Sequence, residues 1–275
     1  MMMRNVSILL MSLCLLVAAQ VQAQCPVNIN QFQAGETLTY DLYFKWGLVN
    51  TKAGISTLTT ISQKYNGKDA YKMALTAKSS GMVNKVFSIN DTLASYMTKD
   101  LIPLAFHKNA EEGGDHTIEN MTYTYNPSGG ISVHSKRVKN GEQRFDEVIN
   151  YNSCVYDMIS VVFYARTLDF SSMKKGQETR VDFISGKRKT YMIIEYQGTE
   201  KMKANDDKTY DCIKLVLSIM NASEKAFEDK EEAMKVYITN DNNRMPVRLD
   251  SKLNVGSTRA ILKGYKGLKH EVNAK

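Results

Sequence analysis

The stretch TLTYDLYF, residues 37–44, alternates apolar and polar side chains with a period of two. Leu38, Tyr40, Leu42 and Phe44 fall on one face of an extended chain, whereas two threonines and an aspartate fall on the other. Successive side chains of a strand point to opposite sides of a sheet. The spacing therefore predicts a β-strand with one buried face and one wet face.

The same alternation recurs along most of the chain, in residues 71–78, 121–125, 213–219 and 234–238. Short pairs whose residues tolerate positive φ separate such segments and predict hairpins, namely Asn66-Gly67, Asn140-Gly141 and Ser185-Gly186. Strands joined by tight turns pair in antiparallel fashion. The sequence thus predicts an all-β fold, mainly antiparallel, with curved sheets or a barrel-like or sandwich body.

One segment in the middle of the chain breaks the strand rhythm. From Asn152 to about Phe170 the apolar residues follow helical spacing, with Asp157 in the first turn and Arg166 near the end. Apolar residues surround most of the circumference, so the helix should be buried on several sides. We expect two β halves around one central α-helix, with bounds of about 32–150, 153–170 and 177–265.

The N-terminus has the pattern of a cleavable signal peptide. Arg4 precedes an apolar run, residues 6–19, that is too short and too close to the N-terminus for a stable membrane span. Val21 and Ala23 are the compact residues that a signal peptidase reads. We expect cleavage after Ala23, which gives a signal peptide over residues 1–23 and a single β-rich domain over residues 24–275.

These features predict export to the periplasm or the extracellular space. A lipoprotein signal would need a small residue before the acylated cysteine, whereas Gln24 precedes Cys25, so lipid anchoring is the less favoured alternative. No later segment reaches the roughly 20 apolar residues of a transmembrane helix. The full chain carries a net charge of +7, and its cations are scattered, which favours a solvated surface over nucleic-acid or membrane-surface binding.

Three cysteines remain after the expected cleavage: Cys25, Cys154 and Cys212. Because the number is odd, at least one thiol stays free or pairs between chains. If a pair forms within the chain, we favour Cys154 with Cys212, since both lie at the edges of predicted elements. The alternative is three unpaired cysteines with two of them buried.

The predicted helix carries a polar stripe formed by Asp157, Ser160 and Tyr164, which lie three and four residues apart. Arg166 is about half a turn out of phase with Asp157, so it needs a partner elsewhere. The stripe could line a pocket, or it could bond backbone groups left free at the ends of the sheet. The second alternative is favoured, because buried polar groups need partners whether or not a ligand binds.

Motifs for common chemistry do not occur in the sequence. The histidines lack metal-ligand spacing, and neither a G-x-S-x-G nucleophile elbow nor a phosphate-binding glycine loop is found. We therefore predict no catalytic residue, no metal and no cofactor. The 15 tyrosines, nine phenylalanines and one tryptophan suit a β core and, as a second choice, an apolar groove.

Three groups of residues resemble an exported bacterial family known as domain of unknown function 3108. The matching positions are Phe32-x-x-Gly35-Glu36-x-Leu38-x-Tyr40 with Trp46-Gly47 and Ala53-Gly54, Asp157-x-x-Ser160-x-x-Phe163-Tyr164-x-Arg166, and Asp241-x-x-Arg244-x-Pro246-Val247 with Gly256 and Ala260-x-Leu262. The resemblance implies a β-rich periplasmic protein without established catalytic residues. The candidate pocket or motif residues are Glu36, Tyr40, Trp46, Asp157, Ser160, Tyr164, Arg166 and Arg244.

Asp91-Thr92-Leu93 also resembles the O-glycosylation triplet of Bacteroidota, which suggests a member of that type. The leading functional hypothesis is a noncatalytic envelope protein that binds a lipid or other apolar ligand, or a partner protein, beside the central helix. The alternatives are an envelope hydrolase with dispersed carboxylates and a purely structural interaction protein. Buried carboxylates facing each other across a cleft would favour the hydrolase, and an apolar trough would favour the binder.

Overall fold

The structure of the protein is a computed structural model that describes residues 27, 29–127, 129–221, 231–252 and 256–275. For Trp46, Val49, Asn221 and residues 231–233 it describes the backbone only. The expected signal peptide, its cleavage site after Ala23 and the cysteine at position 25 lie outside the described residues.

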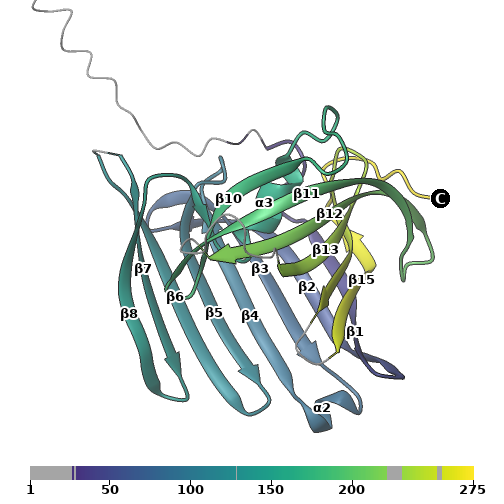
Figure 1. Cartoon of the computed structure of the whole chain (residues 1–275), viewed down its shortest axis with the longest axis horizontal. Coiled ribbons are helices and arrows are strands. Elements are labelled where there is room, and N and C mark those ends of the chain that lie inside the picture. Colours follow the sequence, from purple (N-terminus) through teal and green to yellow (C-terminus); the bar gives the residue numbers. More distant parts are fainter. Residues whose placement is uncertain (1–26, 28, 128, 222–230, 253–255) are drawn as a thin grey trace, which may run out of the picture.

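In the described part of the chain, fifteen strands form one sheet (Figure 1). The strands are β1 Thr37–Trp46, β2 Val49–Tyr65, β3 Lys68–Ser79, β4 Ile89–Met97, β5 Pro103–Glu112, β6 Asp115–Tyr125, β7 Ile131–Lys139, β8 Glu142–Tyr151, β9 Val155–Tyr156, β10 Glu178–Ser185, β11 Arg188–Lys203, β12 Thr209–Asn221, β13 Glu231–Thr239, β14 Pro246–Lys252 and β15 Ser257–Lys266. The helices are α2 Val83–Val86 and α3 Ser160–Thr167.

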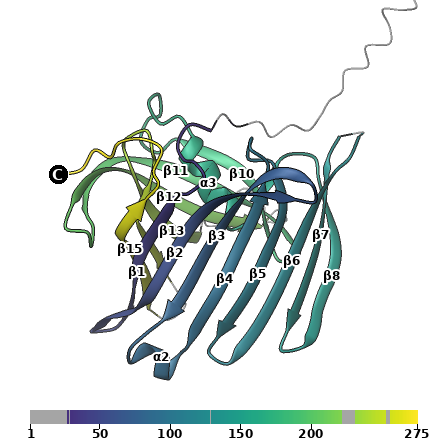
Figure 2. The same ribbon diagram turned by 180° about the vertical axis from the view of Figure 1, so that it is seen from behind.

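In the sheet, β8 to β1 lie side by side in reverse chain order, and β15 to β9 follow, also in reverse chain order. The two series meet where β1 pairs with β15. Neighbouring strands are antiparallel except for the short pair of β9 with β10. The sheet curls into a nearly closed barrel, and α3 lies between the two halves (Figures 1 and 2). The predicted barrel-like all-β fold around a central helix is confirmed.

Two of the predicted hairpins show the expected backbone. Asn66 and Gly67 join β2 to β3, and Asn140 and Gly141 join β7 to β8, all four with positive φ. Two successive residues with positive φ form the turn that matches the twist of paired strands. These dipeptides therefore fix the register of both hairpins.

The barrel is closed by side chains where its edge strands approach. The Ser135 hydroxyl on β7 donates to the carbonyl oxygen of Gly186, in the β10–β11 turn, at 2.8 Å. Lys187 from that turn forms a salt bridge of 2.9 Å with Glu147 on β8. The β10–β11 turn thus fastens one half of the barrel to the other.

The central helix begins later than the predicted position near residue 153. Val155 and Tyr156 form β9, and the helix follows a turn that starts at Asp157. The Asp157 carboxylate accepts the Ser160 N–H at 2.9 Å, while the Ser160 hydroxyl accepts the Asp157 N–H at 2.8 Å. These reciprocal bonds resemble those of a capping box and, with the bond from the Val161 N–H to the Asp157 carbonyl oxygen at 3.1 Å, fix the turn from which the helix starts. The predicted burial is confirmed, since five of its eight residues are buried.

The predicted Cys154–Cys212 disulfide is wrong. Cys154 is disulfide-bonded, whereas Cys212 is a free and buried thiol. Cys212 lies on β12, three strand positions from β9, and Cys154 immediately precedes β9. Three strand spacings are about 14 Å, and a disulfide requires Cα atoms within about 7 Å.

Candidate functional site

Arg166 and Glu36, two of the predicted site residues, form a buried ion pair. Two nitrogens of the guanidinium bind the two carboxylate oxygens at 2.6 and 2.8 Å, and both side chains are essentially inaccessible. Arg166 Nη2 also donates to the carbonyl oxygen of Asn243 at 2.9 Å. The expectation that Arg166 finds a partner outside its own helix is confirmed.

Aromatic rings complete the surroundings of this pair. The Arg166 guanidinium lies 4.9 Å from the ring centre of Phe32 and 5.5 Å from that of Phe163. Aromatic faces stabilise a guanidinium, most strongly where water is excluded. Because its nitrogens are bonded within the protein, Arg166 joins α3 to the segment before β1 and offers no free group to a ligand.

Asp157 lies at a second buried polar centre, at the start of α3. Besides the helix N–H groups, its carboxylate accepts a hydrogen bond from the Ser95 hydroxyl on β4 and one from the Tyr123 hydroxyl on β6 at 3.4 Å. Burial raises the pKa of Asp157 and of Tyr123. Asp157 therefore anchors the start of the helix to the sheet. The Tyr164 ring lies against that of Tyr156, tilted by 35°, with 4.7 Å between the ring centres.

Of the remaining predicted site residues, Tyr40 and Arg244 are not hydrogen-bonded to either centre, although the charges of Arg166 and Glu36 act on the Tyr40 hydroxyl. Tyr40 is buried on β1 and donates its hydroxyl to the carbonyl oxygen of Pro246 at 2.9 Å, and burial raises its pKa. Arg244 lies in the turn before β14, with its guanidinium 5.4 Å from the ring centre of Phe170. The side chain of Trp46 is outside the described atoms.

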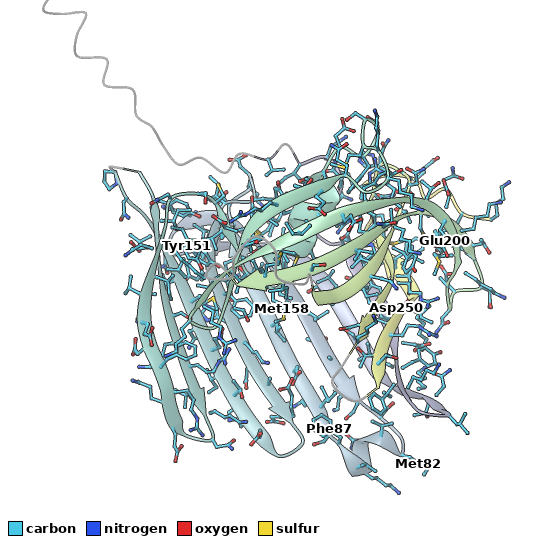
Figure 3. The ribbon with its side chains drawn as sticks, in the orientation of Figure 1. Met82, Phe87, Tyr151, Met158, Glu200 and Asp250 are labelled. Atoms are coloured by element: carbon cyan, nitrogen blue, oxygen red, sulfur yellow. The ribbon has the colours of Figure 1, made fainter. Side chains whose placement is uncertain are left out.

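An apolar cavity of about 320 Å³ lies between α3 and the inner wall of the barrel. Its lining comes from the start of α3, from β1, β2 and β3, and from β13, β14 and β15. The lining residues are Tyr40, Leu42, Ser56, Leu58, Leu75, Ala77, Met158, Ile159, Val162, Met234, Pro246, Leu249, Ser251, Thr258, Arg259 and Ala260. Tyr40 is the one predicted site residue among them, and Met158 lies near the middle of the molecule (Figure 3).

The cavity presents hydrocarbon with few free polar groups. The hydroxyl of Ser56 donates to the carbonyl oxygen of Thr76 at 2.8 Å, and that of Tyr40 is bonded as described. Leu42, Leu75 and Leu249 are only partly buried although their side chains face the inside of the barrel. The sequence did mark Leu42 and Leu75 as inward-facing, but it could not show that their contacts are incomplete.

Beyond β3 the inner wall of the barrel carries carboxyl groups as well as apolar side chains. Asp91 on β4 pairs across the sheet with Ala77, a cavity residue, and its carboxyl lies beside that of Glu112. Burial and the neighbouring Glu112 charge raise the pKa of Asp91 to about 6. Glycoside hydrolysis needs two carboxyl groups at least about 5 Å apart, so this contacting pair does not match it.

Two kinds of feature are absent from the described residues. These residues contain no cluster of three or more histidine, cysteine, aspartate or glutamate side chains that could hold a metal ion. They also contain no helix long and apolar enough to span a bilayer.

Three solved structures from bacteria match the chain to different degrees. A β-barrel-like protein of domain of unknown function DUF1849 from Brucella abortus matches with a TM-score of 0.57 and 8% identity, over 85% of this chain and 97% of that one. A Bacteroides fragilis protein described as exported and YmcC-like in fold gives a TM-score of 0.36 and 11% identity, over 88% and 100%. A protein from Parabacteroides distasonis described as a lipoprotein gives 0.30 and 12%, over the same shares.

At this identity the Brucella structure establishes the fold alone. Among curated proteins none matches the sequence. The model of a family described as protein of unknown function (DUF3108) matches residues 39–263, which include all fifteen strands except the first two and last three residues of the sheet. The resemblance seen in the motifs around Tyr40, Asp157 and Arg244 is thereby confirmed, and the chain belongs to the DUF3108 family.

Proposed function

We propose that the protein is a noncatalytic, exported envelope protein that binds an apolar or amphipathic ligand in the cavity beside α3. The observation that carries the proposal is the cavity itself, about 320 Å³ in volume and lined mainly by apolar side chains. Ligand pockets in proteins span roughly 300–1,000 Å³ and are lined in the same way. Export is inferred from the signal-peptide pattern of residues 1–23.

The physical argument concerns the side chains that line this space. Protein interiors are usually packed as densely as organic crystals, and a void forfeits contacts that its lining atoms could make. Leu75 on β3 and Leu249 on β14, four strands apart in the sheet, both line the cavity and remain partly exposed. A hydrocarbon chain would complete their contacts and gain roughly 0.8 kcal/mol for each methylene group buried.

The test combines a native measurement with variants. Native mass spectrometry after gentle extraction should show a copurified apolar molecule, and the emptied protein should bind a fluorescent apolar probe. Ala260→Phe and Ala77→Phe place a ring in the cavity and should abolish probe binding. Thr76→Phe is the matched control, because Thr76 is exposed on the outer face of the same strand as Ala77.

Three results would contradict the proposal. The first is a protein that is extracted without a bound apolar molecule and that also binds no probe. The second is an equal loss of probe binding in Ala77→Phe and Thr76→Phe. The third is copurification of a stoichiometric protein partner seated over the cavity. The last result would favour the partner-binding alternative. The hydrolase alternative draws no support from the four described buried carboxylates, because each is held in a structural contact: Glu36 with Arg166, Asp41 with Lys52, Glu119 with Arg137, and Asp157 with the N–H of Ser160.

A further inference from the structure

Exposed apolar side chains gather at one end of the barrel. Of ten large apolar side chains exposed among the described residues, four lie in the β1–β2 turn and in the α2 segment. Leu48 is fully exposed, Met82 and Val86 are 83% and 88% exposed, and Phe87 is about half exposed. Met82 and Phe87 project at the lower tip of the molecule (Figure 3), at the end opposite α3 (Figure 1).

The segment that carries three of these side chains is fixed to the sheet. The Ser80 N–H donates to the carbonyl oxygen of Ala53 on β2 at 2.8 Å, and the Ser79 hydroxyl donates to Asn84 Oδ1 at 2.5 Å. The Phe87 ring lies against Gly113, so closely that a Cβ there would overlap it. The fold therefore presents Met82 and Val86 to the outside in a defined position.

Lysines surround this apolar tip. Lys45, Lys78 and Lys85 are exposed, and none of them forms a salt bridge with another described residue. Of the nearest acids, Glu112 forms a salt bridge of 3.8 Å with Lys108 and Asp115 one of 2.7 Å with Lys139. Glu111, which accepts a hydrogen bond from the neutral Asn90 at 3.1 Å, and Asp91 form no salt bridge with a described residue. The three unpaired lysines thus outnumber the two unpaired acids, and the excess charge beside the apolar side chains is positive.

The tip lies at the end of the barrel toward which the apolar cavity extends. Ala77, Ser251 and Thr258 line the cavity and lie within two residues of a strand end on this side. The opposite end is covered by α3, which contributes Ile159 to the lining and is held by the buried Arg166. An amphiphile that leaves a surface in contact with the tip would therefore have a short path to the cavity.

We propose that this membrane-contact tip, formed by Leu48, Met82, Val86 and Phe87 with Lys45, Lys78 and Lys85, binds the surface of a bilayer that contains anionic lipid. Projecting apolar side chains among lysines insert into the headgroup region and are attracted by anionic lipids. A protein partner is the weaker match, because protein interfaces are depleted in lysine. The inference stands on the tip alone and does not require the cavity to hold a ligand.

The experiment measures binding of the full mature chain to vesicles of phosphatidylcholine with and without phosphatidylglycerol, by co-sedimentation. The wild type should bind the anionic vesicles and bind more weakly as salt is raised. Replacing Leu48, Met82 and Val86 by serine should weaken binding at least about ten-fold. Lys85→Gln should weaken it about five-fold.

The matched control replaces three exposed apolar residues on the side wall of the barrel, Ile61, Ile118 and Val148, by serine. The control should bind vesicles as the wild type does, and both triple variants should keep the wild-type melting temperature. Equal binding by the tip variant and the control, or no dependence on phosphatidylglycerol, would overturn the proposal. A wild type that binds vesicles but takes up no apolar probe would support membrane contact by the tip and refute ligand binding in the cavity. The failure of one proposal can therefore be told from the failure of the other.

Discussion

Removal of the Arg166 cation tests whether the buried pair with Glu36 holds the central helix in place. Arg166→Ala leaves the Glu36 carboxylate buried without its two guanidinium bonds and vacates the space beside the Phe32 and Phe163 rings. Removing one partner of a buried ion pair costs about 3–5 kcal/mol. For a chain of this size each kcal/mol lowers the melting temperature by about 2–4 °C, so we expect a loss of roughly 6–20 °C.

Urea unfolding followed by circular dichroism gives the free energy of unfolding, and an unchanged m-value shows that the variants can be compared. The control is Lys72→Ala, because Lys72 lies on the outer face and its ammonium is 5.7 Å from the ring centre of Tyr96. An exposed cation–π contact contributes about 0.5–1 kcal/mol. Equal free energies of unfolding for Arg166→Ala and Lys72→Ala would refute the reasoning. The double variant Glu36→Gln with Arg166→Met should recover part of the loss, since it leaves no buried charge unpaired.

Three further predictions concern single side chains. Asp157→Ala should lower the free energy of unfolding by at least about 1–2 kcal/mol, because it removes the acceptor of the Ser160 N–H and that of the Ser95 hydroxyl. A smaller change in urea unfolding would contradict the role of Asp157 at the start of the helix. The pKa of Asp91 is raised from the usual 3.8 to about 6 in the folded protein, so folding favours the protonated carboxyl. The contribution of Asp91 to the free energy of unfolding is therefore fully present below pH 3.8 and is lost as the pH rises through 6. Asp91→Asn should therefore flatten the pH dependence of stability in that window, and a wild-type slope in the variant would argue against it. Burial raises the pKa of the Cys212 thiol to about 12, so iodoacetamide should label Cys212 only after unfolding, as read by mass spectrometry of the native and denatured protein.

The local patterns of the sequence predicted the fold well. The alternation of Leu38 and Tyr40 with polar neighbours reports directly which face of a strand is buried, and Asn66-Gly67 requires a backbone that a hairpin provides. The start of the helix was placed too early because residues 155–156 pair with β10, a partner more than twenty residues away. A contact of that range leaves no mark in the local spacing.

Strand order is the information that the sequence lacked. The rejected Cys154–Cys212 pair was plausible as long as the distance between β9 and β12 was unknown. The same applies to Glu36 and Arg166, which are 130 residues apart in the chain and were both selected without being recognised as partners. The apolar cavity depends on the pairing of β1 with β15, which brings Leu42 and Ala260 together.

The family-motif residues and the cavity are linked by the position of α3. A helix that could settle into the barrel would bring Ile159 and Val162 against Leu75 and close the space that they now share. The Arg166–Glu36 pair holds the C-terminal end of α3, and the bond of Asp157 to Ser95 holds the N-terminal end. Two polar anchors at opposite ends therefore oppose the collapse that apolar burial would otherwise favour. We infer that these residues act by holding the cavity open. Asp157→Ala should therefore weaken apolar-probe binding even under conditions in which the protein stays folded. Tyr164→Phe removes a hydroxyl outside both anchors and should leave probe binding unchanged.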